Sequence, residues 1–367
     1  MMDPDVRCNN CGRAYPETGA PYRCQSCAGL YDYSSLRLFD PALINRSQPG
    51  IWRYRHTFGL SPDSEPVSFG EGNTPLVWVS IFGRRVALKC EYINPSGSFK
   101  DRGSSVIVSL LKSRGITNAI EDSSGNAGAS FAAYAARAGM KAQIYIPECA
   151  SGPKRRQITA YGAELITIAG SRSDVANAVM KKANEGVVYA SHAYLPFNIP
   201  GYATTAYEIF EQLDEKMPGS VVLPVGQGGF LLGLAYGFKN LRIATHEYKH
   251  LPKMIGVQTS ACAPLWKLFS RGKTGSGSNP PIKTIAEGVD VQNPVRATSM
   301  IKVVRASNGK IIQIEEEDIL AGREALARLG FYIEPTSAIV WPALKETIQD
   351  LPDPIVVILT GSGLKNE

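Results

Sequence analysis

The stretch YINPSGSFKDRG, Tyr92 to Gly103, places one lysine, Lys100, at a crowded point of the chain. Small and turn-forming residues precede Lys100, and an acid, an arginine and a glycine follow it directly. The segment before it, RRVALKCEY (84–92), predicts a strand, and the apolar stretch after it, which ends at Gly115, predicts a helix that Lys100 opens. Lys100 therefore lies at a strand–turn–helix junction, where the protein can hold a side chain that would otherwise extend into water.

Strand-like and helix-like segments alternate along the rest of the chain. Runs rich in Val and Ile predict strands, and the runs of about ten to fifteen residues between them predict helices. This alternation is typical of parallel α/β layers. The predicted strands are 84–92, 118–121, 141–147, 163–170, 187–192, 220–224, 253–260 and 353–358, and the predicted helices are 100–115, 126–137, 151–162, 171–186, 204–213, a helix after 229, and 316–330.

Three glycine-rich turns follow apolar strands: SSGNAG (123–128), PVGQGG (224–229) and LTGSG (359–363). Ligands of open parallel sheets bind beyond the carboxyl ends of the strands. The first two turns also precede a helix, whose free N–H groups and positive dipole end suit a phosphate or a carboxylate. Each turn alone is weak evidence for a ligand site, because any strand–helix connection can need a glycine turn. The glycine fingerprints of NAD- and ATP-binding loops are absent from the sequence.

Length and composition limit the class of protein. The 367 residues (39.7 kDa) favour two domains and a small appendage, and 44% apolar with 20% charged residues is ordinary for a soluble globular protein. No apolar run reaches the roughly 20 residues of a membrane helix, and no secretory signal opens the chain, so we expect a cytoplasmic protein without a membrane partner. The net charge of +6 is spread out, and nothing resembles a nucleic-acid module. Its densest cluster, PKRRQ (153–157), is either a solvated helix face or an attractor of an anionic substrate.

Four cysteines near the N-terminus form two C-x2-C pairs, CNNC (8–11) and CQSC (24–27). Each pair suits a tight knuckle that points two thiolates at one ion, and four thiolates favour a closed, structural Zn²⁺ site. The segment GRAYPETGAPYR (12–23) suits a short β-ribbon between the knuckles, and disulfides are the alternative in an oxidising compartment. The predicted zinc ligands are Cys8, Cys11, Cys24 and Cys27. The isolated Cys90, Cys149 and Cys262 are expected to be buried apolar residues.

With these residues in hand, the sequence resembles the fold-type II family of pyridoxal-phosphate enzymes, and within it the threonine synthases most closely. The segment NPSGSFKDRG (94–103) matches the family's cofactor lysine motif, SSGNAGAS (123–130) its ring and carboxylate loop, and PVGQGG its phosphate loop. EGNTPL (71–76), EPTSA (334–338) and LTGSGLK (359–365) follow in the family's order, so that the resemblance covers roughly 65–365. A thiolate zinc ribbon precedes the catalytic body in some threonine synthases.

The resemblance implies an α/β fold of two three-layer domains with mostly parallel twisted sheets, plus a small N-terminal zinc ribbon. The zinc ribbon would occupy 1–35. A large cofactor-binding domain would comprise 36–103 and 191–367, with a small α/β domain inserted at 104–190. By the same resemblance we expect a homodimer.

The resemblance also assigns roles residue by residue. Lys100 would bind the cofactor aldehyde through its deprotonated amine and later act as a general base. Asn126 would contact the cofactor's phenolic oxygen. Thr360 would face the pyridine nitrogen, where a hydroxyl cannot hold that nitrogen protonated, which suits elimination and replacement rather than transamination. The substrate carboxylate would lie against Ser123, Ser124, Gly125 and Ala127, and the cofactor phosphate against Gly226, Gln227, Gly228 and Gly229.

The sequence departs from the threonine synthase pattern in the segment LPFNIPGYAT (195–204). Asn198 stands where the family has an arginine and Ala203 where it has a lysine that help to hold the substrate phosphate. Either Lys154, Arg155 or Arg156 substitutes for them, or the substrate is not phosphorylated. Ser362 also replaces a common histidine. Glu287, Glu334 and His192 are open to two interpretations, polar groups near the site or ordinary structural side chains.

The resulting function is that of a pyridoxal 5'-phosphate-dependent carbon–oxygen lyase that acts on a small amino-acid substrate. The leading prediction is a threonine synthase, which converts O-phosphohomoserine and water to threonine and phosphate. The alternatives are a serine or threonine dehydratase and a β-replacement synthase of the cysteate or cysteine type. A silent scaffold whose ribbon docks a partner is the alternative from outside enzymology, and the intact Lys100 and its three loops argue against it.

Overall fold

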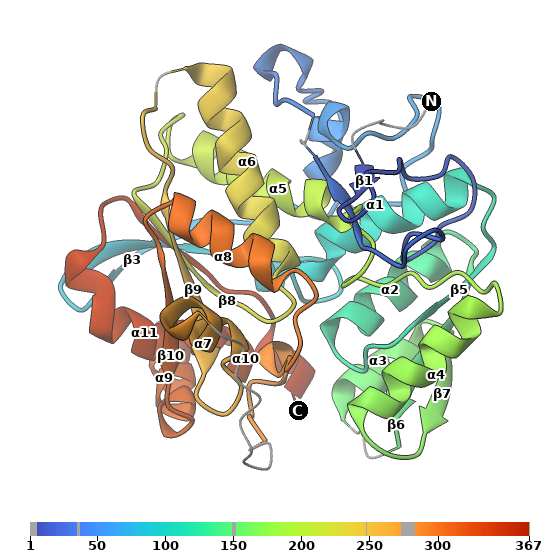
Figure 1. Cartoon of the computed structure of the whole chain (residues 1–367). Coiled ribbons are helices and arrows are strands. Elements are labelled where there is room, and N and C mark those ends of the chain that lie inside the picture. The colour runs from blue at the N-terminus through green and yellow to red at the C-terminus, as the bar shows by residue number, and fades with distance from the viewer. Residues whose placement is uncertain (1–5, 35–36, 149–151, 247, 273–282, 367) are drawn as a thin grey trace. The chain divides into compact units, whose positions relative to one another are not determined.

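The computed structural model describes residues 6–34, 37–148, 152–246, 248–272 and 283–366 (Figure 1). The chain forms two compact units: unit 1 comprises Met1–Gly72, Lys100–Gly201 and Asn366–Glu367, and unit 2 comprises Asn73–Phe99 and Tyr202–Lys365. These units divide the chain at other points than the predicted domains, whose boundaries stay a prediction. Among the described residues, no helix combines the length and the apolar character needed to cross a bilayer.

Unit 2 contains a six-stranded sheet in the order β10-β9-β8-β11-β4-β3. Its strands are β3 (Leu76–Ile81), β4 (Arg84–Lys89), β8 (Ser220–Pro224), β9 (Lys253–Thr259), β10 (Lys310–Ile314) and β11 (Ile355–Ile358). All neighbours pair in parallel except β3, which pairs antiparallel with β4 through a tight turn at Phe82 and Gly83. The predicted α/β class with mostly parallel strands is confirmed.

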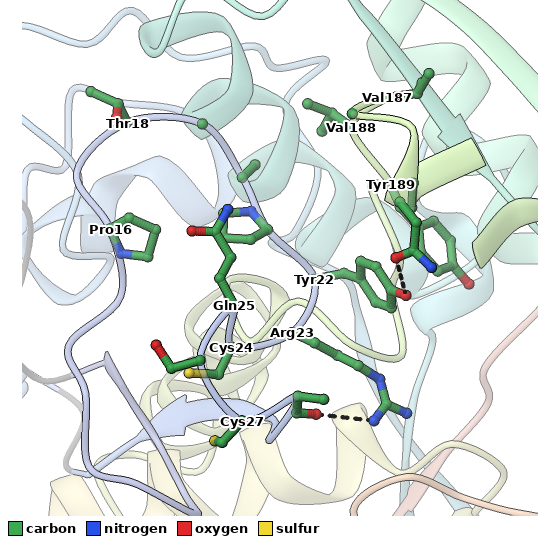
Figure 2. A pocket seen from close by; sticks show the side chains of 18 residues that line it. Pro16, Thr18, Tyr22, Arg23, Cys24, Gln25, Cys27, Val187, Val188 and Tyr189 are labelled. Atoms are coloured by element: carbon green, nitrogen blue, oxygen red, sulfur yellow. Dashed lines mark hydrogen bonds between the residues drawn. The ribbon is translucent and has the colours of Figure 1, made fainter. Parts of the chain in front are cut away.

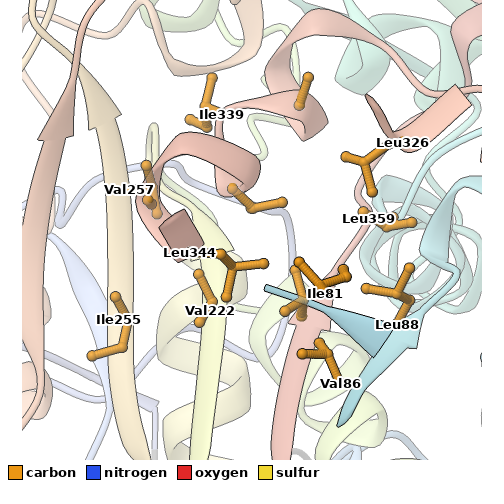
Figure 3. Close-up of a cluster of buried hydrophobic side chains, with 14 of the residues drawn as sticks. Ile81, Val86, Leu88, Val222, Ile255, Val257, Leu326, Ile339, Leu344 and Leu359 are labelled. Atoms are coloured by element: carbon orange, nitrogen blue, oxygen red, sulfur yellow. The ribbon is translucent and has the colours of Figure 1, made fainter. Parts of the chain in front are cut away.

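Helices cover both faces of this sheet. Figure 1 shows α6 and α8 on one side and α9 and α11 on the other. The second side buries alternate strand residues, among them Leu88, Val222, Ile255 and Val257, against Ile339 and Leu344 (Figure 3). Because full burial of each such side chain contributes about 1.5–3 kcal/mol, this core fixes the register of the sheet. The helices of unit 2 are α6 (Gly229–Thr245), α7 (Pro264–Arg271), α8 (Ala297–Ala306), α9 (Glu317–Arg328), α10 (Pro335–Ala338) and α11 (Val340–Thr347), and α5 (Asn198–Gln212) begins in unit 1 and ends in unit 2.

Unit 1 contains a three-stranded parallel sheet of β5 (Asn118–Glu121), β6 (Lys141–Pro147) and β7 (Glu164–Ile168). Its helices are α1 (Lys100–Ser113), α2 (Asn126–Arg137), α3 (Pro153–Ala160) and α4 (Arg172–Asn184). Both α2 and α4 contact the central strand β6. The α4 side buries Tyr145, Val175 and Val179 in one cluster.

The predicted strand 187–192 is wrong. Tyr189 makes a single parallel bridge with Ile120. The Ile120 N–H donates to the Val188 carbonyl oxygen, and the Ala190 N–H donates to the Ile120 carbonyl oxygen. The side-chain oxygen of Ser191 then accepts the N–H groups of Ala193 and Tyr194, which turns the chain away from the sheet edge.

The N-terminal ribbon pairs β1 (Val6–Cys8) with β2 (Tyr31–Tyr33) antiparallel. These strands flank the two cysteine knuckles, so the prediction of a ribbon within 12–23 is wrong apart from one bridge between Arg7 and Ala14. Pro16 and Pro21 lack the N–H groups that a ladder in this segment would need. Short 3-10 helices complete the described chain at Pro41–Leu43, Gly50–Thr57, Glu91–Ile93, Glu287–Val289, Ile348–Asp350 and Gly363–Asn366.

Candidate functional site

The glycine turn 226–229 joins β8 to the 17-residue helix α6 in unit 2. Gly228, the N-cap of α6, has φ 79°, and a Cβ there would collide with the sulfur of Met300. A Cβ on Gly226 would lie 2.5 Å from the carbonyl oxygen of Gly288. At Gly226 and Gly228 only backbone can therefore line the turn, and the first N–H groups of α6 have no acceptor within the helix. This geometry suits a phosphate group.

Thr360 follows β11, the neighbour of β8, and is buried with Ser337. The Ser337 Oγ accepts the N–H groups of Thr360 and Gly361, each at 2.9 Å, and lies 2.8 Å from the Thr360 Oγ1. We assign the hydroxyl hydrogens from this geometry. Because both lone pairs of the Ser337 Oγ accept N–H groups, we assign the short contact with Thr360 to a hydrogen bond that the Ser337 hydroxyl donates to the Thr360 Oγ1. Thr360 then keeps its own hydrogen for another acceptor, as an unprotonated ring nitrogen would require.

The residue before Lys100 lies beside both of these features. The Phe99 N–H donates to the Thr360 carbonyl oxygen at 3.1 Å, and its ring stacks on Phe230, the second residue of α6, with centroids 4.3 Å apart. Lys100 is bonded to Phe99, so their Cα atoms lie about 3.8 Å apart. Unit 2 therefore brings Phe99, the glycine turn 226–229 and Thr360 together at the carboxyl ends of adjacent strands. The Lys100 side chain is half-buried at the start of α1.

The predicted carboxylate loop connects β5 to α2 in unit 1. Ser123 is buried, its Oγ accepts the N–H of Gly125 at 3.2 Å, and α2 begins directly at Asn126. A Cβ on Gly128 would collide with the Ser123 carbonyl oxygen, so α2 can start here only because this position is glycine. Ser124, Gly125 and Asn126 are half-buried and Ala127 is buried. The loop thus presents a second helix N-terminus suited to an anion.

Glu121 was not predicted as a site residue. One oxygen of this buried carboxylate accepts the Ser123 N–H at 2.5 Å, and the other lies 2.5 Å from the Nδ1 of His192. Burial works to raise the pKa of Glu121, but the charge of His192 and these hydrogen bonds lower it overall. Burial and the charge of Glu121 raise the pKa of the adjacent Asp122. The signal in the sequence is a pair of acids at the strand end, directly before SSGNAG.

The structure gives reasons for the two departures from the phosphate-binding pattern. The Asn198 side chain is buried and its Nδ2 donates to the His192 carbonyl oxygen at 2.6 Å. Ala203 is fully buried on α5, where a lysine would have to carry its charge out of water.

The remaining residues singled out in the sequence are also placed. On α3, Lys154 is buried, Arg155 half-buried and Arg156 exposed. Ser362 and Glu334 are buried, and Glu287 is exposed. The predicted burial of Cys90 and Cys262 is confirmed, and burial raises their pKa values to about 11 and about 12. Cys149 lies outside the described residues.

The four N-terminal cysteines converge in unit 1, with all four sulfurs within 4.8 Å of one another. Cys8 and Cys27 are 3.4 Å apart and Cys11 and Cys24 are 3.7 Å apart, far longer than the roughly 2.05 Å of a disulfide. Zn–S bonds of about 2.3 Å place tetrahedral sulfurs about 3.8 Å from one another, so the cluster fits this ion. The Ser26 N–H lowers the pKa of Cys24 to about 6, whereas at Cys11 the Arg13 N–H is outweighed by the Cys27 side chain and burial, which raise the pKa of that thiol to about 11.

Aromatic side chains attach this cysteine cluster to the rest of unit 1 (Figure 2). Tyr22 packs on Tyr189 and Tyr194, with ring centroids 5.3 and 5.5 Å apart, and Arg23 lies over the Tyr194 ring. The loop and the segment 183–189 together line a groove of about 920 Å³. The loop therefore contacts the same stretch of chain that carries His192.

Comparisons with known proteins agree with these features. The family model described as "Pyridoxal-phosphate dependent enzyme" matches residues 67–361. The threonine synthases of Methanocaldococcus jannaschii and Methanosarcina acetivorans are 33% and 32% identical, each aligned over 98% of this chain and 92% of the relative. The crystal structure of the T.th. threonine deaminase superposes with a TM-score of 0.67 at 27% identity, covering 79% of this chain and 92% of the other.

Proposed function

The chain belongs to the family of pyridoxal-phosphate dependent enzymes, and from this membership we propose that it is a threonine synthase. It would convert O-phosphohomoserine and water to threonine and phosphate. The observation that carries the proposal is the similarity to threonine synthases over 98% of the chain, a span that includes the cysteine ribbon. A carbon–oxygen lyase of this class needs a cofactor grip, a proton-transferring amine and a carboxylate cradle, and the chain has residues suited to each.

The donor set fits pyridoxal 5'-phosphate. The backbone of the turn 226–229 at the start of α6 would hold the phosphate, Asn126 the phenolic oxygen, Thr360 the ring nitrogen, and Lys100 the aldehyde carbon. When bound, the cofactor supplies an electron-withdrawing ring that stabilises negative charge on the substrate carbon that loses a proton. The Thr360 hydroxyl, which lies 2.8 Å from the Ser337 Oγ, would donate a hydrogen bond to the ring nitrogen without protonating it, which would favour elimination and replacement.

The chain's own residues then bind and orient the substrate and move its protons. The loop 123–127 would hold the substrate carboxylate through N–H groups and hydroxyls. Lys100 Nζ, once released by the substrate amine, would take the proton from the α-carbon and return it there. A lysine can do this only as the neutral amine, and removal from water favours that form.

We assign the cysteine cluster as the binding site of a structural zinc ion. Cys8, Cys11, Cys24 and Cys27 would fill all four coordination positions, so this ion would have no open position for substrate. The N–H groups of Ser26 and Gly29, which lower the pKa values of Cys24 and Cys27, support thiolate ligation. A homodimer, a cytoplasmic location and the lack of nucleic-acid and membrane partners stay predictions from the sequence, and sedimentation of the holoenzyme would check the first of them.

A dehydratase is the second candidate, and a specific observation favours it. Positions 198 and 203 lack the cations that help to hold a substrate phosphate, and the T.th. threonine deaminase shares the fold at 27% identity. A β-replacement synthase shares the first of these arguments.

One paired assay separates these activities. Phosphate release and threonine formation from O-phosphohomoserine are measured beside 2-oxo acid formation from threonine and serine. The proposal expects phosphate and threonine in equal amounts. A higher kcat/KM for 2-oxo acid formation would replace threonine synthase by a dehydratase.

A further inference from the structure

We propose that the imidazole of His192, oriented by Glu121, is the acid that protonates the departing phosphate. This inference rests on the proposed function, because it concerns the leaving group of O-phosphohomoserine. It adds a catalytic residue, His192, and a positioning residue, Glu121, to the site described above. Every contact that supports it lies within unit 1.

The first support is that one carboxylate joins His192 to the predicted substrate loop. The two oxygens of Glu121 bond the backbone N–H of Ser123 and the Nδ1 of His192, both at 2.5 Å. The Glu121 side chain is 1% exposed and that of His192 is 16% exposed, so solvent reaches the imidazole but not the carboxylate. His192 thus lies one side chain away from the amide expected to border the substrate carboxylate.

The second support is the tautomer that this geometry imposes. A carboxylate only accepts hydrogen bonds, so Nδ1 carries a hydrogen and Nε2 is the nitrogen that exchanges protons. A buried carboxylate on Nδ1 also stabilises the imidazolium, as in serine hydrolase triads. The pair Glu121–His192 can therefore deliver a proton from Nε2 and recover it within one turnover.

The third support is that the backbone around His192 is fixed from both sides. Asn198 Nδ2 donates to the His192 carbonyl oxygen at 2.6 Å, and Ser191 Oγ accepts the next two N–H groups. Tyr189 and Tyr194, which flank this turn, pack on Tyr22 of the ribbon. The side chain that replaces the family's arginine thus holds the histidine in place.

The reaction needs such an acid. A phosphate ester with a pKa near 6 is a dianion at neutral pH, and its phosphate would leave as a trianion without a proton. As the Cγ–O bond breaks, the electron pair goes to the phosphate oxygen, and His192 Nε2 gives that oxygen its proton. When water later forms the Cβ–O bond, the neutral imidazole takes the water proton, which restores His192. Lys100 would remove one proton from Cα and one from Cβ, and would deliver one to Cγ and one back to Cα, so atoms and charges balance.

Among the described residues, Glu121 and Asp122 interact with His192, and Arg172 of α4 and Tyr189 interact in turn with Asp122. A general acid must carry its proton before it can donate it, so phosphate release by the wild type should decline with rising pH.

The experiment compares single-turnover phosphate release by wild-type holoenzyme, His192→Asn and His192→Gln across pH. His250→Asn, which changes an exposed histidine in unit 2, is the control. Removal of a general acid costs about 10²–10⁴-fold, and the alkaline decline should vanish in both His192 variants. Their visible cofactor absorbance and the KM for substrate should change less than about threefold, since neither depends on the proton. If His192→Asn does not fold, the pH profile of His192→Gln decides.

Two other results have different meanings. A His192 variant that releases phosphate at the wild-type rate and with the wild-type pH profile would overturn the inference and leave the proposed function intact. A wild type that forms neither phosphate nor threonine would remove the proposed function itself. Glu121→Gln should lower the rate less than His192→Asn, because it changes only the orientation and basicity of the imidazole.

Discussion

Ser337 shows how one hydroxyl can determine both stability and chemistry at this site. Its Oγ accepts two buried N–H groups, those of Thr360 and Gly361, and orients the Thr360 hydroxyl. A buried donor left without an acceptor costs about 1–3 kcal/mol. The consequence can be measured by a single substitution.

Ser337→Ala should lower the free energy of unfolding by about 2–5 kcal/mol, since it leaves two buried N–H groups without an acceptor. Urea denaturation of the apoenzyme measures this change. Ser362→Ala is the matched control, because the Ser362 Oγ accepts a single, longer bond from the Leu364 N–H at 3.3 Å. Equal losses for the two variants would contradict the role assigned to Ser337.

Asp122 supplies a prediction about pH. Burial and the charge of Glu121 raise its pKa, so the folded chain disfavours its charged form. Stability therefore falls as pH rises from the unfolded pKa of about 3.9 through the folded pKa, and stays lower above it. Asp122→Asn should raise the melting temperature at pH 7 and have no effect near pH 3. Asp63→Asn, which changes an exposed carboxylate, should leave the melting temperature unchanged at both pH values.

At this scale, the sequence was sufficient where a residue's role follows from its neighbours along the chain. Lys100 could be found because small residues precede it and a helix follows. Glu121 and Ser337 could not, because their partners, His192 and Thr360, are 71 and 23 residues away. Hydrogen bonds between distant segments leave no periodic signal in a single sequence.

At the scale of elements, the turn between β8 and α6 depends on glycine for two separable reasons. Gly228 has a positive φ, and it also lies against Met300. Gly330 has a positive φ of 92° with no atom within 4 Å of its added Cβ. The two positions therefore distinguish backbone strain from a steric collision.

Gly228→Ala should weaken pyridoxal 5'-phosphate binding at least about tenfold, or 1.4 kcal/mol, because the turn must open to make room for the new methyl group. Gly330→Ala should leave binding unchanged and lower only stability. Titration of both apoenzymes with the cofactor, followed by absorbance, gives the comparison. Unaltered affinity in Gly228→Ala would mean that this turn does not hold the cofactor phosphate.

The cysteine ribbon has a similar test. A Cβ on Gly29 would lie 2.7 Å from the Cys8 sulfur and 3.3 Å from the Cys27 sulfur. Gly29→Ala should therefore lose zinc in the presence of a competing chelator, as measured by metal analysis. Ser26→Ala should retain it, since the amide that bonds Cys24 belongs to the backbone and the side chain is exposed. A wild type purified without zinc would contradict the metal assignment.

Segments with a strong hydrophobic periodicity were predicted well. Segments whose structure depends on exposure or on a local side-chain contact were not. The helix 126–137 and the strand 141–147 agree with α2 and β6 residue for residue. β3 and β10 were not predicted, since β3 exposes most of its residues at least partly on both faces and follows a loop-rich segment. The predicted strand at 187–192 failed because Ser191 captured two backbone N–H groups, a contact that strand propensity does not include.

At the scale of the whole molecule, each of the two units carries its own group of predicted site residues. Unit 2 gathers the glycine turn 226–229, Thr360 and the residue before Lys100, and unit 1 carries the loop 123–127 and the Glu121–His192 pair. The order of these segments could be predicted from resemblance to a family. The boundaries of the units could not, because they depend on packing between segments far apart in the sequence.

The central claim is that Lys100 carries the cofactor, and borohydride reduction of the holoenzyme tests it directly. Reduction makes the lysine–cofactor link permanent, and mass spectrometry of the digested protein identifies the modified residue. The added mass should be on the peptide containing Lys100, in one copy per chain. Label on another lysine, or no label after incubation with pyridoxal 5'-phosphate, would contradict it.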